Sequence, residues 1–194
     1  MGEDLATWFN QNLLTGKIRF PDYKNDWETI MLKDLVDCTN SKKELRHVDE
    51  MDTGKYPIYT SQGLYKKIPV YDMEVDYIGL NLHGSPGKSI LAHKGSSMNS
   101  THAYLTIKEE ANIDLIWLFL QLQNIHWNKY IQGSTIKSIK WKDFNKEKIL
   151  VPCIKEQEHI LGFFNAFKRR TELIEQQIHL MKLFKKGLLQ QLFV

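Results

Sequence analysis

The stretch VPCIKEQEHILGFFNAFKRR, residues 151–170, decides how this chain is organised. Pro152 ends one element, and a glutamate-containing turn opens another that no later proline interrupts. We therefore expect one helix over residues 155–193, roughly 58 Å long at 1.5 Å per residue. A compact domain of about 150 residues is only about 30 Å across, so part of this helix must project. The chain is thus divided into a domain over residues 1–150 and a helical arm over 151–194.

The apolar residues of this helix recur with the spacing of a coiled coil. Successive positions are 3, 4, 7, 4, 3, 7 and 4 residues apart, and Arg170 and Lys185 lie near the two skipped core positions. Such spacing, with charges between, is typical of helices that pair. A helix folded back on its own domain is the alternative, but the length argues against it. The predicted dimerisation stripe, for a homodimer or a second half-subunit, comprises Ile160, Phe163, Phe167, Ile174, Ile178, Met181, Leu188 and Leu192.

The first 150 residues predict an α/β (α+β) domain with a β-rich core. Helical spacing predicts helices over residues 3–14 and 113–127, with a helical turn at 141–144. The polar stretch 39–55 is predicted as a loop. Between residues 56 and 107, short runs rich in β-branched and aromatic residues are separated by polar turns and predict strands. These runs are YPIYT, LYKKIPVY, VDYIGLNL, SILAH and AYLTI.

The net charge is only +3, but the charge is unevenly distributed. Counting Lys and Arg against Asp and Glu gives −4 (7 against 11) for residues 1–53, +3 (6 against 3) for 54–108 and +4 (6 against 2) for 128–148. A basic, loop-rich middle favours a polyanionic partner such as nucleic acid. Lysines scattered over a solvated surface are the alternative.

No familiar catalytic or nucleotide-binding motif is present. The GKS of GSPGKS lacks the first phosphate-loop glycine, because Leu82 stands five residues before Gly87. The seven histidines show no metal-ligand spacing. No apolar run reaches the roughly 18 residues of a membrane span, no signal-peptide pattern opens the chain, and two isolated cysteines fit a reducing compartment. We therefore expect a cytoplasmic binding protein without a cofactor, a metal or a catalytic site of its own.

Two alternatives belong to other functional classes. The acids of DMEVD, namely Asp72, Glu74 and Asp76, could hold Mg²⁺ in a nuclease, although alternating acids at the start of a strand are more often solvated. Assaying the chain on DNA with Mg²⁺ separates this alternative from a binding protein. An assembly or inhibitor protein without DNA contact is the second alternative, and salt-sensitive DNA binding would argue against it.

Four segments, taken together, resemble the specificity subunit of type I restriction-modification enzymes. In order, they are KYPIYTSQGL, GLNLHGSPGKSILAHKGSSMNSTHAYLTI, IQGSTIKSIKWKDFNKEKILVPCIKEQEHI and LIEQQIHLMKLFKKGLLQQLF. The segment GKIRFPDYKNDWETIMLKDL also resembles the opening of a target recognition domain in that family. The resemblance covers nearly the whole chain. Its most specific parts are the Gly-Ser-Thr loop leading into ILVPCIKEQEHI and the closing LMKLFKKGLLQQLF.

The resemblance implies that residues 1–150 are a target recognition domain, which binds double-stranded DNA and reads part of a bipartite sequence. It implies that the helix pairs antiparallel with another, acts as a ruler and docks methyltransferase subunits. A full subunit has two recognition domains and two helical regions, whereas this chain has one of each and looks like a half-subunit. Methylation and cleavage, with S-adenosylmethionine and ATP, would belong to the methyltransferase and restriction subunits.

Four polar loops are our candidates for contacting DNA. Their hydroxyl, amide, imidazole and ammonium groups suit both base edges and phosphates. Since an Asn amide can bond adenine and a Lys can bond guanine, Asn81, Lys88 and Asn99 are predicted to set base preference. Ordinary turn chemistry is the alternative for each residue. The candidates are Ser61, Gln62, Asn81, His83, Ser85, Lys88, Asn99, Ser100, His102, Gln132, Ser134, Thr135, Lys137 and Lys140.

Overall fold

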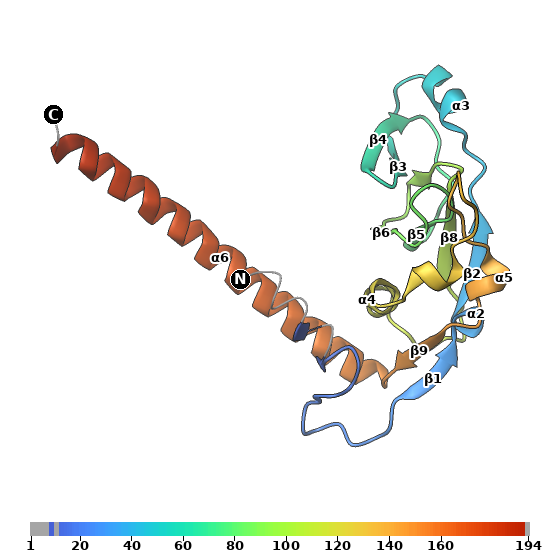
Figure 1. Ribbon diagram of the computed structural model, residues 1–194, viewed down its shortest axis with the longest axis horizontal. Coiled ribbons are helices and arrows are strands. Elements are labelled where there is room, and N and C mark those ends of the chain that lie inside the picture. Colours follow the sequence, from blue (N-terminus) through green and yellow to red (C-terminus); the bar gives the residue numbers. More distant parts are fainter. Residues whose placement is uncertain (1–7, 10–11, 193–194) are drawn as a thin grey trace. The chain divides into compact units, whose positions relative to one another are not determined.

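The computed structural model of the chain describes residues 8, 9 and 12–192, with side chains of the last helix up to residue 190 (Figure 1). The described residues fall into two compact units, which divide between Gln157 and Glu158. The predicted helix over residues 3–14 lies partly outside the described residues, and within it Trp8, Phe9 and Asn12 are helical.

A four-stranded antiparallel sheet forms the centre of the first unit. Its strands, in spatial order, are β2 (Val36–Asn40), β8 (His102–Ile107), β5 (Tyr77–Asn81) and β6 (Ser89–Ala92). Every residue of β5 is buried, as expected for a continuous apolar strand covered on both faces. The predicted strands SILAH, VDYIGLNL and AYLTI are therefore confirmed. In the register of β5 and β8, Asn81 lies opposite His102.

A second sheet has the order β4-β3-β7. Strands β3 (Tyr56–Thr60) and β4 (Gly63–Ile68) form an antiparallel hairpin, and the two-residue strand β7 (Ser97–Met98) runs parallel to β3. Helix α3 (Leu45–Glu50) adds Val48 to the buried side chains of Ile58 and Ile68. The prediction of a plain loop over residues 39–55 was therefore wrong, because one buried valine among polar residues leaves no periodic pattern to recognise.

The remaining elements of the first unit bring the beginning and the end of its sequence together. Strand β1 (Glu28–Met31) pairs with β9 (Lys148–Val151), and α2 (Leu32–Leu35) connects β1 to β2. Helix α4 (Leu115–Gln123) buries Trp117, whose indole Nε1 donates to the carbonyl of Leu150. The 3₁₀ helix η1 (Trp127–Tyr130) and the short helix α5 (Trp141–Phe144) follow, and the predicted helical turn at 141–144 is confirmed.

Helix α6 (Ile154–Leu192) is the long predicted helix. Its first turn belongs to the first unit, because the buried Glu156 carboxylate accepts two 2.8 Å hydrogen bonds from Arg19 and one of 3.0 Å from Trp27 Nε1. The buried amide of Gln157 bonds to the backbone of Asp114 and Pro152. Among the described helices, none is both long enough and apolar enough to cross a membrane.

Candidate nucleic-acid interface

Loops far apart in the sequence are joined by backbone hydrogen bonds in the first unit. The β5–β6 loop meets the loop of residues 132–138, since Gly84 N donates to the carbonyl of Lys137 at 2.8 Å and Ile139 N to that of Leu82 at 2.9 Å. His83 and Ser138 also form an isolated β-bridge. Two of the four candidate loops therefore lie side by side.

The loop before β8 joins the same group. Leu82 N donates to the carbonyl of Thr101 at 2.7 Å, which ties this loop to the β5–β6 loop. Asn99 N donates to the carbonyl of Tyr59 at 3.0 Å, two residues before the β3–β4 turn that holds Ser61 and Gln62. The β5–β6 loop, the loop of residues 132–138 and the loop before β8 are thus directly linked. The remaining candidate loop, with Ser61 and Gln62, follows β3, to which the loop before β8 is bonded.

Two glycines are required for the conformation of these loops. Gly87 has φ +88°, and a Cβ there would lie 2.3 Å from the Trp127 ring. Gly133 has φ +89°, and its Cβ would lie 2.4 Å from the carbonyl oxygen of Ile136. Both positions require glycine for its conformation and for its lack of a side chain. The Trp127 ring packs edge-on against Phe144, with 5.3 Å between the ring centroids. The β5–β6 loop therefore packs, at Gly87, against an aromatic pair.

Three of the candidate side chains are buried. Asn81, Asn99 and His102 are 1%, 4% and 1% exposed. His102 Nδ1 lies 2.7 Å from Asn99 Oδ1, and Nε2 lies 3.3 Å from Asn81 Nδ2. A neutral ring with the proton on Nδ1 satisfies both contacts, donating to Asn99 and accepting from Asn81. Burial lowers the pKa of His102 to about 4, which favours this neutral form.

The other candidate side chains are more accessible. Ser61 and Ser100 are half-buried. Gln132 donates through Nε2 to Asp143 Oδ2 at 2.9 Å. Lys88, Lys137 and Lys140 form no ion pair with any described residue, so their charges are available to an anionic ligand. The exposed candidates are Gln62, His83, Ser85, Lys88, Gln132, Ser134, Thr135, Lys137 and Lys140.

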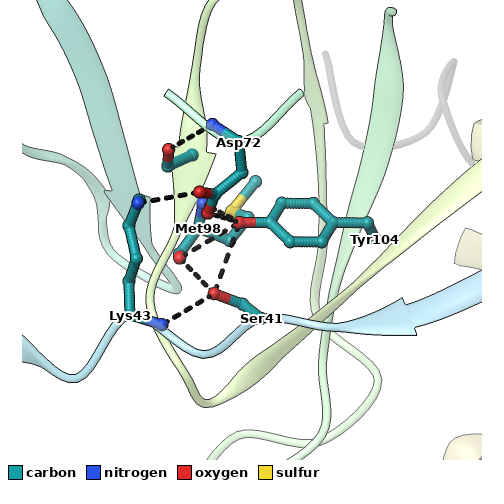
Figure 2. A network of polar contacts seen from close by, with 6 residues as sticks. Ser41, Lys43, Asp72, Met98 and Tyr104 are labelled. Atoms are coloured by element: carbon teal, nitrogen blue, oxygen red, sulfur yellow. Dashed lines mark hydrogen bonds and ion pairs between the residues drawn. The ribbon is translucent and has the colours of Figure 1, made fainter. Parts of the chain in front are cut away.

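A polar network that the sequence did not reveal lies at the junction of the two sheets (Figure 2). The hydroxyl of Tyr104 donates to Asp72 Oδ2 at 2.6 Å and accepts from Met98 N at 3.0 Å. Asp72 also pairs with Lys43 at 2.7 Å, and Ser41 Oγ donates to the carbonyl of Met98 at 2.6 Å. Burial, together with the bond to Asp72, raises the pKa of Tyr104. Of this network, only Asp72 stands out in the sequence, as one of the acids of DMEVD. Its partners Lys43 and Tyr104 lie about 30 residues away on either side, so no local pattern connects the three.

Two of the three acids of the nuclease alternative, Asp72 and Asp76, are engaged in internal contacts, and Glu74 is exposed. Asp72 is paired with Lys43, as described above. Asp76 accepts from the backbone N–H of Lys94 at 2.9 Å and from His93, and these bonds lower its pKa. Within the described part of the chain, no group of three or more His, Cys, Asp or Glu residues could hold a metal ion. This geometry gives the Mg²⁺ hypothesis no support.

The stripe predicted on α6 consists mainly of exposed apolar side chains. Ile160 is buried, whereas Phe163, Phe167, Ile174, Ile178, Met181 and Leu188 are 40–70% exposed. The side chain of Leu192 lies outside the described residues. A second exposed row consists of Leu173, Leu180 and Phe184. Each residue of this row precedes Ile174, Met181 or Lys185 by one position, which places the row about 100° around the helix from the first stripe.

The fold of this chain, a β-rich domain followed by a long helix, is similar to that of solved specificity subunits. The S subunit of the type I restriction-modification system from M. genitalium superposes with a TM-score of 0.63, at 22% identity, over 80% of this chain and 42% of its own. The HsdS subunit from Thermoanaerobacter tengcongensis gives 0.61 at 13% identity, over 90% of this chain and 46% of its own. At these identities the likeness concerns the fold alone.

Sequence comparison gives the family. Residues 24–182 match the model of the type I restriction modification DNA specificity domain, and the chain belongs to this family. The type I restriction enzyme MjaVIII specificity subunit of Methanocaldococcus jannaschii is 27% identical over 186 residues, which are 91% of this chain and 43% of that protein. The chain spans less than half the length of each of these relatives. The resemblance drawn from the sequence is therefore confirmed at the level of the family and the fold.

Proposed function

We propose that this chain is a sequence-specific DNA-recognition part of a type I restriction-modification complex and reads one half of a bipartite site. The observation that carries the proposal is the linkage of candidate loops from three separate stretches of sequence. Their exposed side chains include three lysines that pair with no acid among the described residues. Lys137 and Lys140 neutralise phosphates, which supplies most of the affinity.

In this proposal the exposed polar side chains contact bases. His83, Ser85, Ser134 and Thr135 carry donors and acceptors, and they extend from two loops that are bonded to each other. Gln62, with the half-buried Ser61 and Ser100, extends the surface toward the second sheet. The variety of polar groups suits the different hydrogen-bond patterns of base pairs in the major groove.

We assign a supporting role to the three buried candidates. Asn81 and Asn99 are each hydrogen-bonded to the His102 ring, and a buried amide has no route to a base edge while it keeps that contact. They fix the ends of β5 and β8, from which two of the loops extend. Lys88, which is exposed, therefore remains the base-reading candidate among the three residues first predicted to set base preference.

The two apolar rows of α6 favour two separate partners. One row suffices for a two-stranded coiled coil, and the partner helix is a second copy of this chain or another recognition half. The second row, about 100° away, needs a separate cover, which we assign to the methyltransferase subunit. Methylation and cleavage, with their S-adenosylmethionine and ATP, take place on the methyltransferase and restriction subunits.

Methylation mapping tests the proposed function. The full chain is mixed with its cognate methyltransferase subunit and a library of randomised DNA duplexes, and the methylated adenines are sequenced. A homodimer reads a symmetric, interrupted sequence, because its two-fold axis relates two equal half-sites. An asymmetric interrupted sequence indicates a different second half. Methylation without sequence preference, or DNA binding that is insensitive to salt, would overturn the proposal.

A further inference from the structure

The loop of residues 132–138 closes on itself. Gln132 and Ser138 exchange backbone hydrogen bonds of 2.8 and 2.9 Å. Next to Gln132, Gly133 makes a turn so close to the carbonyl of Ile136 that no side chain fits there. The residues between these ends are therefore held in one tight turn, and Ser134, Thr135, Ile136 and Lys137 are all exposed on it.

The apolar residue of this turn is unusually accessible. Ile136 is 68% exposed, and no large apolar side chain described before α6 is more exposed. Isoleucine is branched at Cβ and therefore stiff, so its position follows the backbone closely. Single exposed apolar residues are ordinary on protein surfaces and need no explanation by themselves. Ile136 differs because its loop is fixed in place and lies among the candidate DNA contacts.

The loop is anchored on both sides of Ile136. On one side, Gly84 N bonds to the carbonyl of Lys137 and so ties the turn to the β5–β6 loop. On the other side, the Gln132 side chain bonds to Asp143 in α5. Because these contacts already order the loop, a ligand that meets Ile136 does not have to immobilise it, which lowers the entropic penalty of binding.

We propose that Ile136 is a specificity-determining residue that packs against the 5-methyl group of a thymine in the major groove. This inference rests on the proposed function. The thymine methyl is the apolar group that a base pair displays in that groove, and apolar side chains read it by contact. The adjacent Thr135 hydroxyl and Lys137 ammonium groups meet the neighbouring base edge and phosphate. An apolar wedge inserted between base steps is a different use of such a residue, and it does not depend on the methyl group.

The test removes the methyl group from the DNA and the side chain from the protein. Duplexes are selected by the full chain assembled with its methyltransferase subunit, and each thymine is then replaced singly by deoxyuridine. We expect one position where deoxyuridine weakens binding by the parent about 4-fold, the effect of one buried methyl group. Ile136→Ala binds the two duplexes equally at that position. Ile136→Val retains part of the discrimination, whereas Ile136→Thr, which has the shape of valine but a hydroxyl group in place of one methyl group, retains less of it.

Two outcomes overturn the inference without touching the proposed function. In the first, the thymine-to-uridine ratios of the parent and Ile136→Ala agree at every position. In the second, Ile136→Ala keeps those ratios but no longer binds the methyltransferase subunit, so that the turn is a protein contact. A parent complex that selects no sequence defeats the proposed function itself. Because Ile136 is exposed, the variants should unfold at the parent's Tm, which excludes misfolding as the cause of a lost preference.

Discussion

The hydroxyl of Tyr104 in β8 donates a 2.6 Å hydrogen bond to the carboxylate of Asp72, which lies in the connection between β4 and β5. The same hydroxyl accepts from Met98 N in β7, so one side chain of the central sheet holds a strand of the second sheet. Lys43 pairs with the Asp72 carboxylate, which prevents an uncompensated charge next to the core. The contact thereby fixes the segment that leads into Asn99 and Ser100 of the candidate interface.

Tyr104→Phe should destabilise the domain by about 1–3 kcal/mol, because it removes the side-chain oxygen that accepts from the buried Met98 N and one of the two donors to the Asp72 carboxylate. Urea unfolding followed by tryptophan fluorescence measures the loss. Tyr65→Phe is the matched control, since it also removes a hydroxyl that donates to a carboxylate, that of Asp49, but at an exposed site. We expect this control to change the free energy of unfolding by less than about 0.5 kcal/mol. Equal effects of the two substitutions would show that the Tyr104 network does not join the sheets.

The buried His102 should make the stability of the domain depend on pH. Its folded pKa is about 4, below its ordinary value of about 6.5, so the unfolded chain binds more protons between these pH values. Stability should therefore be complete above about pH 6.5 and fall as the pH drops toward 4, by an amount on the order of 3 kcal/mol from this group. Urea unfolding at a series of pH values measures the slope.

A substitution separates this histidine from the other titrating groups. His102→Gln cannot become protonated, so its stability should vary less with pH than that of the parent between pH 4 and 6.5. His47→Gln in α3 is the control, because His47 is exposed. If the stabilities of the parent and of His102→Gln change with pH in parallel, His102 binds a proton equally well in the folded and the unfolded chain. That result would contradict the prediction.

The sequence predicts the elements whose apolar residues are regularly spaced. β5 is recognisable as a buried strand in VDYIGLNL, and α6 from its sustained 3/4 spacing, because these patterns depend on local geometry alone. The loops of the candidate interface are likewise recognisable as polar, glycine-containing segments. Their spatial grouping is not, because it depends on bonds such as Gly84 to Lys137 between residues more than fifty positions apart.

Burial of individual polar residues could not be predicted either. Asn81 and Lys88 belong to the same polar loop segment, yet the amide is buried and the ammonium group exposed. The difference arises because Asn81 lies opposite His102 in the β5–β8 ladder, a pairing that the sequence alone does not specify. Strand β7 was also missed, since two residues are too few to show alternation.

Lys137→Ala and Lys140→Ala should weaken DNA binding about equally on all sequences. Each lost phosphate contact should lower the slope of log K against log salt by about 0.9. Lys182→Ala in α6 is the control, because it removes the same charge from an exposed position outside the first unit. Fluorescence anisotropy at several salt concentrations measures the slopes. Unchanged slopes in both loop variants would remove this loop from the phosphate contacts.

Charges placed on the two rows of α6 should have separable effects. Ile174→Asp and Ile178→Asp put carboxylates into the first stripe, where burial against a partner helix would cost several kcal/mol per charge. Light scattering should therefore show the loss of the dimer, or of the pair formed with another half. Gln176→Asp adds the same charge roughly 200° around the helix from Ile174 and should leave the pairing intact.

Leu180→Asp tests the second row. If this row faces the methyltransferase subunit, the substitution should preserve the helix pairing and weaken binding of that subunit at least 10-fold, because a desolvated carboxylate replaces an apolar contact. Isothermal titration of the full chain with the subunit measures the affinity, and light scattering of the same sample measures the pairing. A variant that loses its pairing instead would assign both rows to one wide helix–helix contact. The methyltransferase subunit would then have to bind elsewhere on the chain.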